Sequence, residues 1–264
     1  LDKGIVMFEW FNLIWDFLHI KKLILIFLLL SIPAEIAAGY LRHFKIYIGS
    51  LKWNAKSFFP CLGIVILIFG LAVLLDPYAA LWARNSSGKF AEVIWSYGAE
   101  MGRSVWIFLA AFYLVFSWNS KLRGIVFGAL LGASLTGLCA TLLKWIVLRA
   151  RPSVDMGQLS FFNWQYLGMD NRDFQSFPSG DVAIVAGTFF FLMRVFKKIP
   201  WLSMLFFLTP FATAFARMHW NRHWFSDAVT SIFLGIGWSF FLFGYEKYRT
   251  LEPEDFKKKK PTGV

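Results

Sequence analysis

The chain has 264 residues, of which 58% are hydrophobic, 20% aromatic and only 16% charged. This composition is too apolar and aromatic for an ordinary soluble domain, and it predicts a protein that crosses a membrane several times. The formal net charge is +11, but the Lys and Arg residues lie between and beside apolar runs, which argues against a nucleic-acid binder and favours contact with anionic membrane lipids.

Residues 1–57 are interpreted as an N-terminal region of their own. Residues 1–22 mix bulky apolar with polar side chains, which favours an amphipathic helix at the membrane interface. Residues 23–41 are apolar enough to enter the bilayer, but Pro33 and Glu35 interrupt them. A true span and a re-entrant or surface-lying helix both stay open for this stretch.

Six apolar runs follow, and each is close to the roughly 20 residues that a helix needs to cross a hydrocarbon core of about 30 Å. They predict an all-α core of six transmembrane helices over residues 58–246, at about 58–75, 104–118, 122–146, 180–196, 200–216 and 228–245. Lys and Arg residues of alternate loops, together with the basic tail 247–264, fall on one side, which the positive-inside rule identifies as cytoplasmic. The other loops then open on the external face.

The first external loop, residues 76–103, begins with Asp76 and Pro77. Apolar residues recur in it at roughly helical spacing. This pattern favours a short helix on the outer membrane surface over a catalytic role.

Residues 144–152 (KWIVLRARP) lead from an apolar run into a polar loop. Lys144 and Arg151 lie nearly two helical turns apart, and Pro152 disfavours a helical conformation at Arg151. The helix should therefore end near Arg151 and release it to turn over a site, where Arg and Lys could bind phosphate oxygens. Snorkelling toward lipid head groups is an equal alternative for Lys144 and Arg151 taken alone, and it is the favoured interpretation for Arg149.

Residues 177–181 (FPSGD) predict the start of a helix. Ser179 is a good N-cap residue, and Gly180 lets a ligand approach backbone N–H groups that would otherwise lack partners. A helix N-terminus favours an anion through these donors and through its partial positive charge. The pattern is weak by itself, since Pro-Ser-Gly begins many helices.

Residues 216–227 (ARMHWNRHWFSD) give the most specific pattern. His223 and Asp227 lie one turn apart, so Asp227 can accept a hydrogen bond from one ring nitrogen while the other nitrogen faces a substrate as nucleophile or base. Arg217 adds a third cation, whereas His219 has no comparable partner and is interpreted as structural. A cluster of cations at a membrane boundary is costly unless an anion lies among them, so the three stretches together predict a phosphate site.

The three stretches resemble the motifs of the type 2 phosphatidic-acid phosphatase superfamily. Residues 144–152 match K-x6-R-P, residues 178–180 match the start of P-S-G-H, and residues 217–227 match the end of S-R-x5-H-x3-D. The resemblance implies a six-helix membrane phosphatase that needs no metal. It also implies that His223 attacks phosphorus to form a phosphohistidine, that Asp227 orients His223, and that water then releases phosphate. The phosphate-binding residues that it implies are Lys144, Arg151, Ser179, Gly180 and Arg217.

Two residues depart from the family pattern. Ala216 replaces a Ser and removes one hydroxyl donor, which other donors could replace. Asp181 replaces the His of the second motif. The resemblance implies that this His is the general acid that protonates the leaving oxygen. An aspartate among several cations should be ionised at neutral pH and a poor acid. Three interpretations stay open: a replacement that disarms the enzyme, a substrate whose leaving group hardly needs protonation, such as a diphosphate or a sugar anomeric phosphate, and an Asp181 that desolvation protonates when the lipid docks.

The sequence therefore favours a lipid phosphate phosphatase of the cell membrane that works at the external face. Its expected partners are membrane lipids, and substrates consistent with it are undecaprenyl diphosphate, lipid A phosphate, phosphatidylglycerol phosphate and phosphatidic acid. A lipid phosphotransferase that uses the same phosphohistidine is the nearest enzyme alternative. A lipid-phosphate-binding or transport protein without chemistry is the alternative from another class, and Asp181 supports it.

Overall fold

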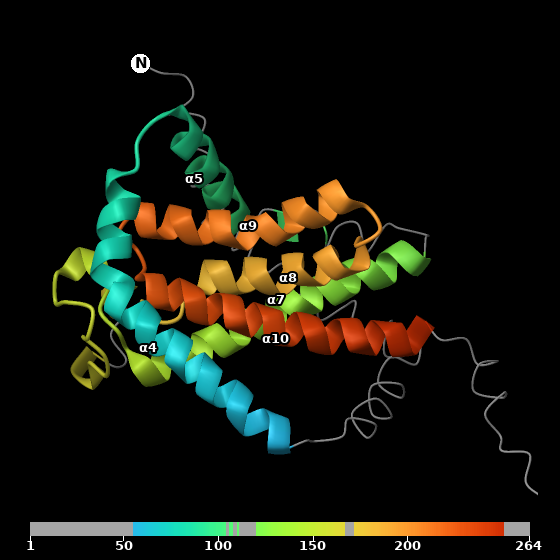
Figure 1. Ribbon diagram of the computed structural model, residues 1–264, viewed down its shortest axis with the longest axis horizontal. Coiled ribbons are helices and arrows are strands. Elements are labelled where there is room, and N and C mark those ends of the chain that lie inside the picture. Colours follow the sequence, from blue (N-terminus) through green and yellow to red (C-terminus); the bar gives the residue numbers. More distant parts are fainter. Residues whose placement is uncertain (1–54, 104–105, 108–109, 111–119, 167–171, 251–264) are drawn as a thin grey trace, which may run out of the picture.

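A computed structural model describes residues 55–103, 106–107, 110, 120–166 and 172–250 of the chain (Figure 1). This part of the chain consists of α-helices, short 3-10 helices and loops without a strand, which confirms the all-α prediction. Most of the predicted N-terminal region 1–57 and of the basic tail 247–264 lies outside the described residues. The predicted helix at 104–118 does so too, except at three positions.

The described helices are long and apolar. They are α4 (Ala55–Asn85), α5 (Lys89–Gly102), α7 (Ser120–Val147), α8 (Gly180–Val195), α9 (Pro200–His219) and α10 (Phe225–Thr250). Four stretches of the described chain are long and apolar enough to cross a membrane: Leu62–Asn85, Gly124–Val154, Pro200–His219 and Phe225–Phe243. These stretches confirm a polytopic membrane protein, since a span needs about 20 apolar residues.

The helix predicted at 58–75 is longer than expected. Asp76 and Pro77, taken as the start of a loop, lie inside α4, which continues to Asn85. Within this helix the Asp76 carboxylate is fully buried and bonds to protein partners instead of reaching solvent as a loop residue would. The short helix expected in the rest of that loop is confirmed as α5, while its position on the membrane surface stays a prediction.

Helix α8 lies at the centre of the bundle and packs against α7, α9 and α10. Figure 1 shows it between α9 and α10. Glycines bring the backbones together, since a β-carbon on Gly187 of α8 would lie 2.5 Å from the carbonyl oxygen of Gly132 on α7. A β-carbon on Gly235 of α10 would lie 2.3 Å from Cβ of Ala186. Small residues at helix crossings allow this close approach in membrane bundles.

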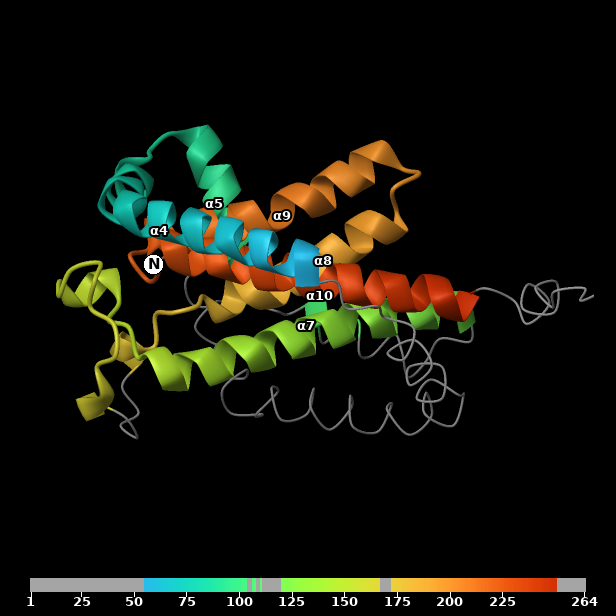
Figure 2. The ribbon, with the colours of Figure 1, turned by 60° about the horizontal axis from the view of Figure 1, so that its bottom comes forward.

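The chain returns repeatedly to one end of the bundle. The connection between α7 and α8 contains the short 3-10 helices η1 (Pro152–Val154), η2 (Trp164–Tyr166) and η3 (Arg172–Phe174). Figures 1 and 2 both show this connection at the end where α10 begins. The end of α7 and the starts of α8 and α10, which carry the three motifs, therefore meet there.

Candidate active site

The three predicted motifs form one site at this end of the bundle. A β-carbon on Gly180 would lie 3.6 Å from Cε of Lys144, so the first motif reaches the start of α8. The hydroxyl of Ser231 on α10 donates to the carbonyl of Ser179 at 2.8 Å, which joins the second and third motifs. Arg217 at the end of α9 lies 3.1 Å from the Asp181 carboxylate. The geometry thus brings together all the residues that the sequence proposed for phosphate binding and chemistry.

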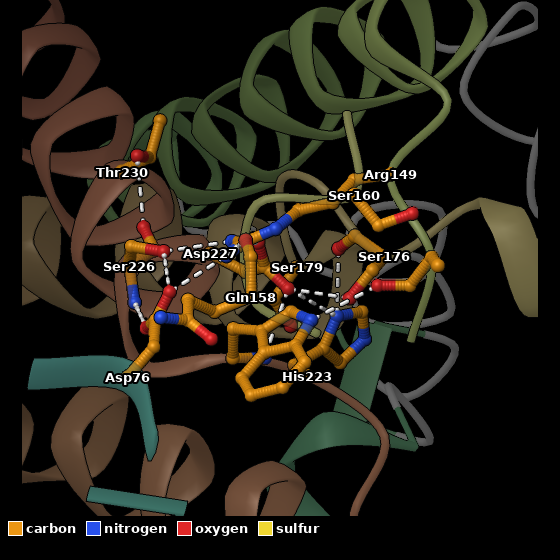
Figure 3. Close-up of polar contacts among 12 residues, drawn as sticks. Asp76, Arg149, Gln158, Ser160, Ser176, Ser179, His223, Ser226, Asp227 and Thr230 are labelled. Carbon is orange, nitrogen blue, oxygen red and sulfur yellow. Dashed lines mark hydrogen bonds and ion pairs between the residues drawn. The ribbon is translucent and has the colours of Figure 1, made fainter. Parts of the chain in front are cut away.

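His223 is held in one orientation by the loop before α8. Its ring is buried, with 4% of the residue exposed, and Nδ1 lies 2.7 Å from the carbonyl oxygen of Ser176 (Figure 3). Because a carbonyl only accepts, Nδ1 carries the proton and Nε2 keeps its lone pair. Burial lowers the pKa of His223 below its ordinary value, so the ring is neutral at pH 7.

The sequence predicted that Asp227 accepts a hydrogen bond directly from the His223 ring. The structure does not show this bond. Oδ2 of Asp227 lies 3.7 Å from Nδ1 and instead accepts from the Ser176 hydroxyl at 2.5 Å and from the Trp224 N–H at 2.9 Å. The hydroxyl and the carbonyl of Ser176 therefore link the pair: the hydroxyl donates to Asp227 and the carbonyl accepts from His223 (Figure 3). The negative charge of Asp227 still lies close to the ring.

Arg149 is fully buried, so its favoured interpretation as a snorkelling residue is wrong. One terminal nitrogen donates to Asp227 Oδ1 at 2.5 Å and to the Ser226 hydroxyl at 2.7 Å. The other donates to Asp76 Oδ2 at 2.6 Å and to the Gln158 carbonyl at 2.5 Å. Two carboxylates hold this guanidinium inside the protein because a buried charge needs paired, hydrogen-bonded partners.

Asp76 is the remote member of this network. It lies on α4 and accepts from the backbone N–H of Ser226 at 2.7 Å as well as from Arg149. Sequence reasoning missed both Asp76 and Ser176. An acidic residue that directly follows a long apolar run is a signal that could have identified Asp76, since such residues usually have a partner. Ser176 carries no comparable signal, because its main contribution is a backbone carbonyl.

Several donors near the start of α8 lack a protein partner. Ser179 is the N-cap of α8, yet its buried hydroxyl makes no hydrogen bond with the described residues. Nε of Arg151 and Nε of Arg217 are also buried without a hydrogen bond, although the latter is within ion-pair distance of Asp181. Buried donors of this kind normally have partners, so an acceptor from outside the described chain fits among them. The helix N-terminus adds positive potential there.

Lys144 and Arg151 border the same place. The helix that carries Lys144 ends at Val147, and Arg151 then adopts an extended conformation, as Pro152 predicted. The backbone N–H of Arg151 donates to the Asp173 carbonyl at 2.7 Å, which fixes the loop. The Lys144 ammonium donates to the Gln175 carbonyl. Gly102 of α5 leaves space for the Arg217 side chain, since a β-carbon there would lie 2.7 Å from Nη2.

His219 lies outside this group of residues. Its Nδ1 is 2.8 Å from the Ala83 carbonyl, and its ring stacks on Trp95 with 5.1 Å between the ring centroids. These contacts agree with the structural role expected from the sequence.

Fold and site together define a helical membrane protein with a buried, neutral imidazole beside donors that suit a phosphate group. Residues 124–251 match a family model, that of the PAP2 superfamily. This match confirms the family resemblance predicted from the three motifs.

One relative agrees with the family match. The chain is 26% identical over 169 residues to the lipid A 4'-phosphatase of Bacteroides thetaiotaomicron, covering 61% of this chain and 74% of the relative. No solved structure gives a significant match. The family and the relative together support a lipid phosphatase.

Proposed function

We propose that the chain is a metal-independent lipid phosphatase that cleaves a lipid phosphomonoester or diphosphate through a phosphohistidine at His223. The observation that carries this proposal is the contact between His223 and Ser176, from which the tautomer of His223 follows. Its Nδ1 faces the Ser176 carbonyl at 2.7 Å, which leaves the Nε2 lone pair for phosphorus.

The first half-reaction joins Nε2 of His223 to phosphorus and breaks the bond from phosphorus to the leaving oxygen. The imidazole then carries a positive charge, which Asp227 stabilises from 3.7 Å without taking the Nδ1 proton. Lys144, Arg151, Arg217, the Ser179 hydroxyl and the Gly180 N–H bind the phosphoryl oxygens. In the second half-reaction, water attacks phosphorus and the imidazole leaves as a neutral ring.

The lipid tail has a place beside this chemistry. A cavity of about 910 Å³ lies between α4, α5, α9 and α10, with a lining that is almost wholly apolar. Met218 and Ala228 line it, and they are next in sequence to Arg217 and Asp227. An acyl or prenyl chain in this cavity would leave its phosphate at the start of α8.

We further propose that the site opens on the external face of the inner membrane, with both termini cytoplasmic. The basic residues that alternate between loops support this orientation through the positive-inside rule. The relative named for lipid A supports a phosphorylated saccharide lipid as one candidate substrate, beside undecaprenyl diphosphate and phospholipid phosphates.

The test is phosphate release by the purified full chain from a panel of these lipids with a chelator present. We expect release in chelator, and a loss of at least about 1,000-fold in His223→Ala. His219→Ala is the matched control and should retain activity. A ³²P-labelled lipid should label the wild type with an acid-labile, alkali-stable adduct that the His223 variant lacks. Wild-type turnover by His223→Ala would reject the proposal, and loss of activity in chelator would reject metal independence.

The same assay separates the alternatives. A lipid phosphotransferase would pass the ³²P label to an added acceptor lipid, whereas a phosphatase gives inorganic phosphate. A binding or transport protein would retain lipid binding in His223→Ala and release no phosphate in either form.

A further inference from the structure

Asp181 occupies the position at which the family resemblance expects a general acid. Its side chain is 39% exposed and lies 3.1 Å from Nε of Arg217, whose side chain is 14% exposed. It also interacts electrostatically with Lys144, Arg151 and His223. In this pair the guanidinium group is the donor and the Asp181 carboxylate is the acceptor. The geometry therefore places an acceptor, and not a proton donor, at position 181.

Among the described residues at the site, none takes the place of the missing histidine as a dedicated proton donor to the leaving oxygen. The guanidinium groups of Arg151 and Arg217 do not release protons. The Lys144 ammonium donates to the Gln175 carbonyl, and its other N–H groups are assigned to the phosphoryl oxygens in the proposed reaction. The His223 proton is on Nδ1 and faces the Ser176 carbonyl, away from the nitrogen that attacks. The site thus offers several donors to a phosphoryl group but little help to a strongly basic leaving group.

We infer that the natural substrate carries a leaving group that departs without protonation. The inference rests on the proposed phosphatase function. Two lipid classes meet this chemical requirement, namely lipid diphosphates, which lose a phosphate monoester, and glycolipids phosphorylated at the anomeric carbon, which lose a stabilised hemiacetal oxyanion. Simple alkyl phosphate monoesters would have to lose an alkoxide, so they are poor substrates.

The proton balance of both half-reactions follows. In the first, the Nε2–P bond forms, the P–O bond breaks, and the leaving oxygen keeps the electron pair and later takes a proton from water. In the second, a water oxygen bonds to phosphorus, its proton passes through the Asp181 carboxylate to solvent, and Nε2 recovers its lone pair. A carboxylate suits this second step because it can act as a base.

The experiment compares three lipids that share one saturated alkyl tail: an alkyl diphosphate, a glycosyl 1-phosphate and an alkyl monophosphate. For the full chain in mixed micelles, we expect kcat/KM for the first or second lipid to exceed that for the monophosphate by at least about 100-fold, the typical contribution of general acid catalysis. Whichever of the two is cleaved faster identifies the class of lipid.

Two variants test the cause of this selectivity. Asp181→His supplies a proton donor. It should lower the ratio of kcat/KM for the favoured lipid to kcat/KM for the monophosphate by at least about tenfold. Asp181→Asn removes the charge without supplying an acid and should leave the ratio wide. The thermal unfolding midpoint of each variant shows that it is folded.

Each other outcome overturns the inference. Equal rates on all three lipids would overturn the inference but would leave the proposed phosphatase function intact. Turnover by Asp181→His alone would show that Asp181 disarms the site, and equal narrowing by Asp181→Asn would assign the effect to charge. Absence of phosphate release from every lipid in both the wild type and Asp181→His would reject the phosphatase function as well.

Discussion

The His223 imidazole depends on a backbone carbonyl for its orientation. Ser176 accepts from Nδ1 and donates its hydroxyl to Asp227, so the carboxylate acts on the ring through an intervening residue. Both Asp227 oxygens already have protein donors, one of them Arg149. The His223 ring can therefore stay neutral and keep its orientation while the charged Asp227 carboxylate lies beside it.

The burial of His223 predicts how activity depends on pH. Because burial lowers the pKa of His223, the nucleophilic neutral ring should persist below the ordinary imidazole value of about 6.5. We expect the acid limb of kcat/KM to lie below that value, as measured between pH 4.5 and 8. Two substrates with different phosphate ionisation are the control, because a limb that shifts with the substrate belongs to its phosphate. A fixed limb at or above 6.5 would contradict the prediction.

The same pKa shift affects stability. The unfolded chain takes up the proton first as the pH falls through about 6.5, since its His223 has the higher pKa. The contribution of His223 to stability is thus complete above this pH and declines below it.

Arg149 is predicted to act as a positioning residue. Arg149→Lys replaces a fork with a point charge that cannot serve Asp76, Asp227, Ser226 and Gln158 together. We expect kcat to fall about 100-fold through misplacement of the His223 pair, with KM within a few-fold because the phosphate donors remain. Steady-state kinetics measure this split. Asp76→Asn keeps the contact between Arg149 and Asp227, so its kcat should fall less than that of Arg149→Lys. A rise in KM as large as the fall in kcat would contradict a positioning role.

At the scale of the elements, α8 brings the motifs into contact. It packs between its neighbours through glycines, and its first turn carries Ser179, Gly180 and Asp181 to the starts and ends of the other helices. Any widening of these crossings would move the start of α8 away from α10, to which Ser231 binds it. Helix packing and site geometry are therefore coupled.

Two glycines on α10 give a matched test of this packing. A β-carbon on Gly235 would meet Cβ of Ala186 at 2.3 Å, whereas one on Gly237 has nothing within 4 Å. We expect Gly235→Ala to destabilise the protein by about 1–3 kcal/mol through overpacking. Gly237→Ala should not destabilise the protein, since the added methyl group touches nothing and Ala is the better helix former. Thermal unfolding midpoints in one detergent measure both, and equal effects would show that the crossing is not the cause.

At the scale of the whole molecule, α8 runs from one end of the bundle to the other. Its first turn lies at the site, and the exposed residues Lys197 and Lys198 follow its other end. The proposed phosphate site at one end and basic residues at the other fit an asymmetric bilayer, in which basic loops remain on the cytoplasmic side.

This asymmetry predicts the sidedness of the protein. In a background of Cys61→Ser and Cys139→Ser, we expect Ser153→Cys, exposed in the loop before α8, to react with an impermeant maleimide in spheroplasts. Lys198→Cys, exposed beyond the other end of α8, should react only after permeabilisation. Mass-tag gel shifts measure both. The reverse pattern would invert the proposed orientation, and reaction of both in intact spheroplasts would exclude it.

The sequence by itself determined the helices and the set of residues gathered at the site. The helices at 122–146, 180–196, 200–216 and 228–245 could be predicted because the length of an apolar run and the residues that end it are local properties. The cations, Ser179 and His223 could be predicted because each stands where an apolar run ends, which is where a charged or polar group is costly without a partner.

Only the tertiary structure decided which groups partner one another. Arg149 could not be assigned, because its partners Asp76 and Asp227 lie 73 and 78 residues away along the chain. The direct bond from Asp227 to His223 was a plausible one-turn pairing, but the Ser176 carbonyl takes that nitrogen. The physical reason is that a buried polar group bonds to whatever the packed helices bring within reach, and that depends on the three-dimensional arrangement of distant segments.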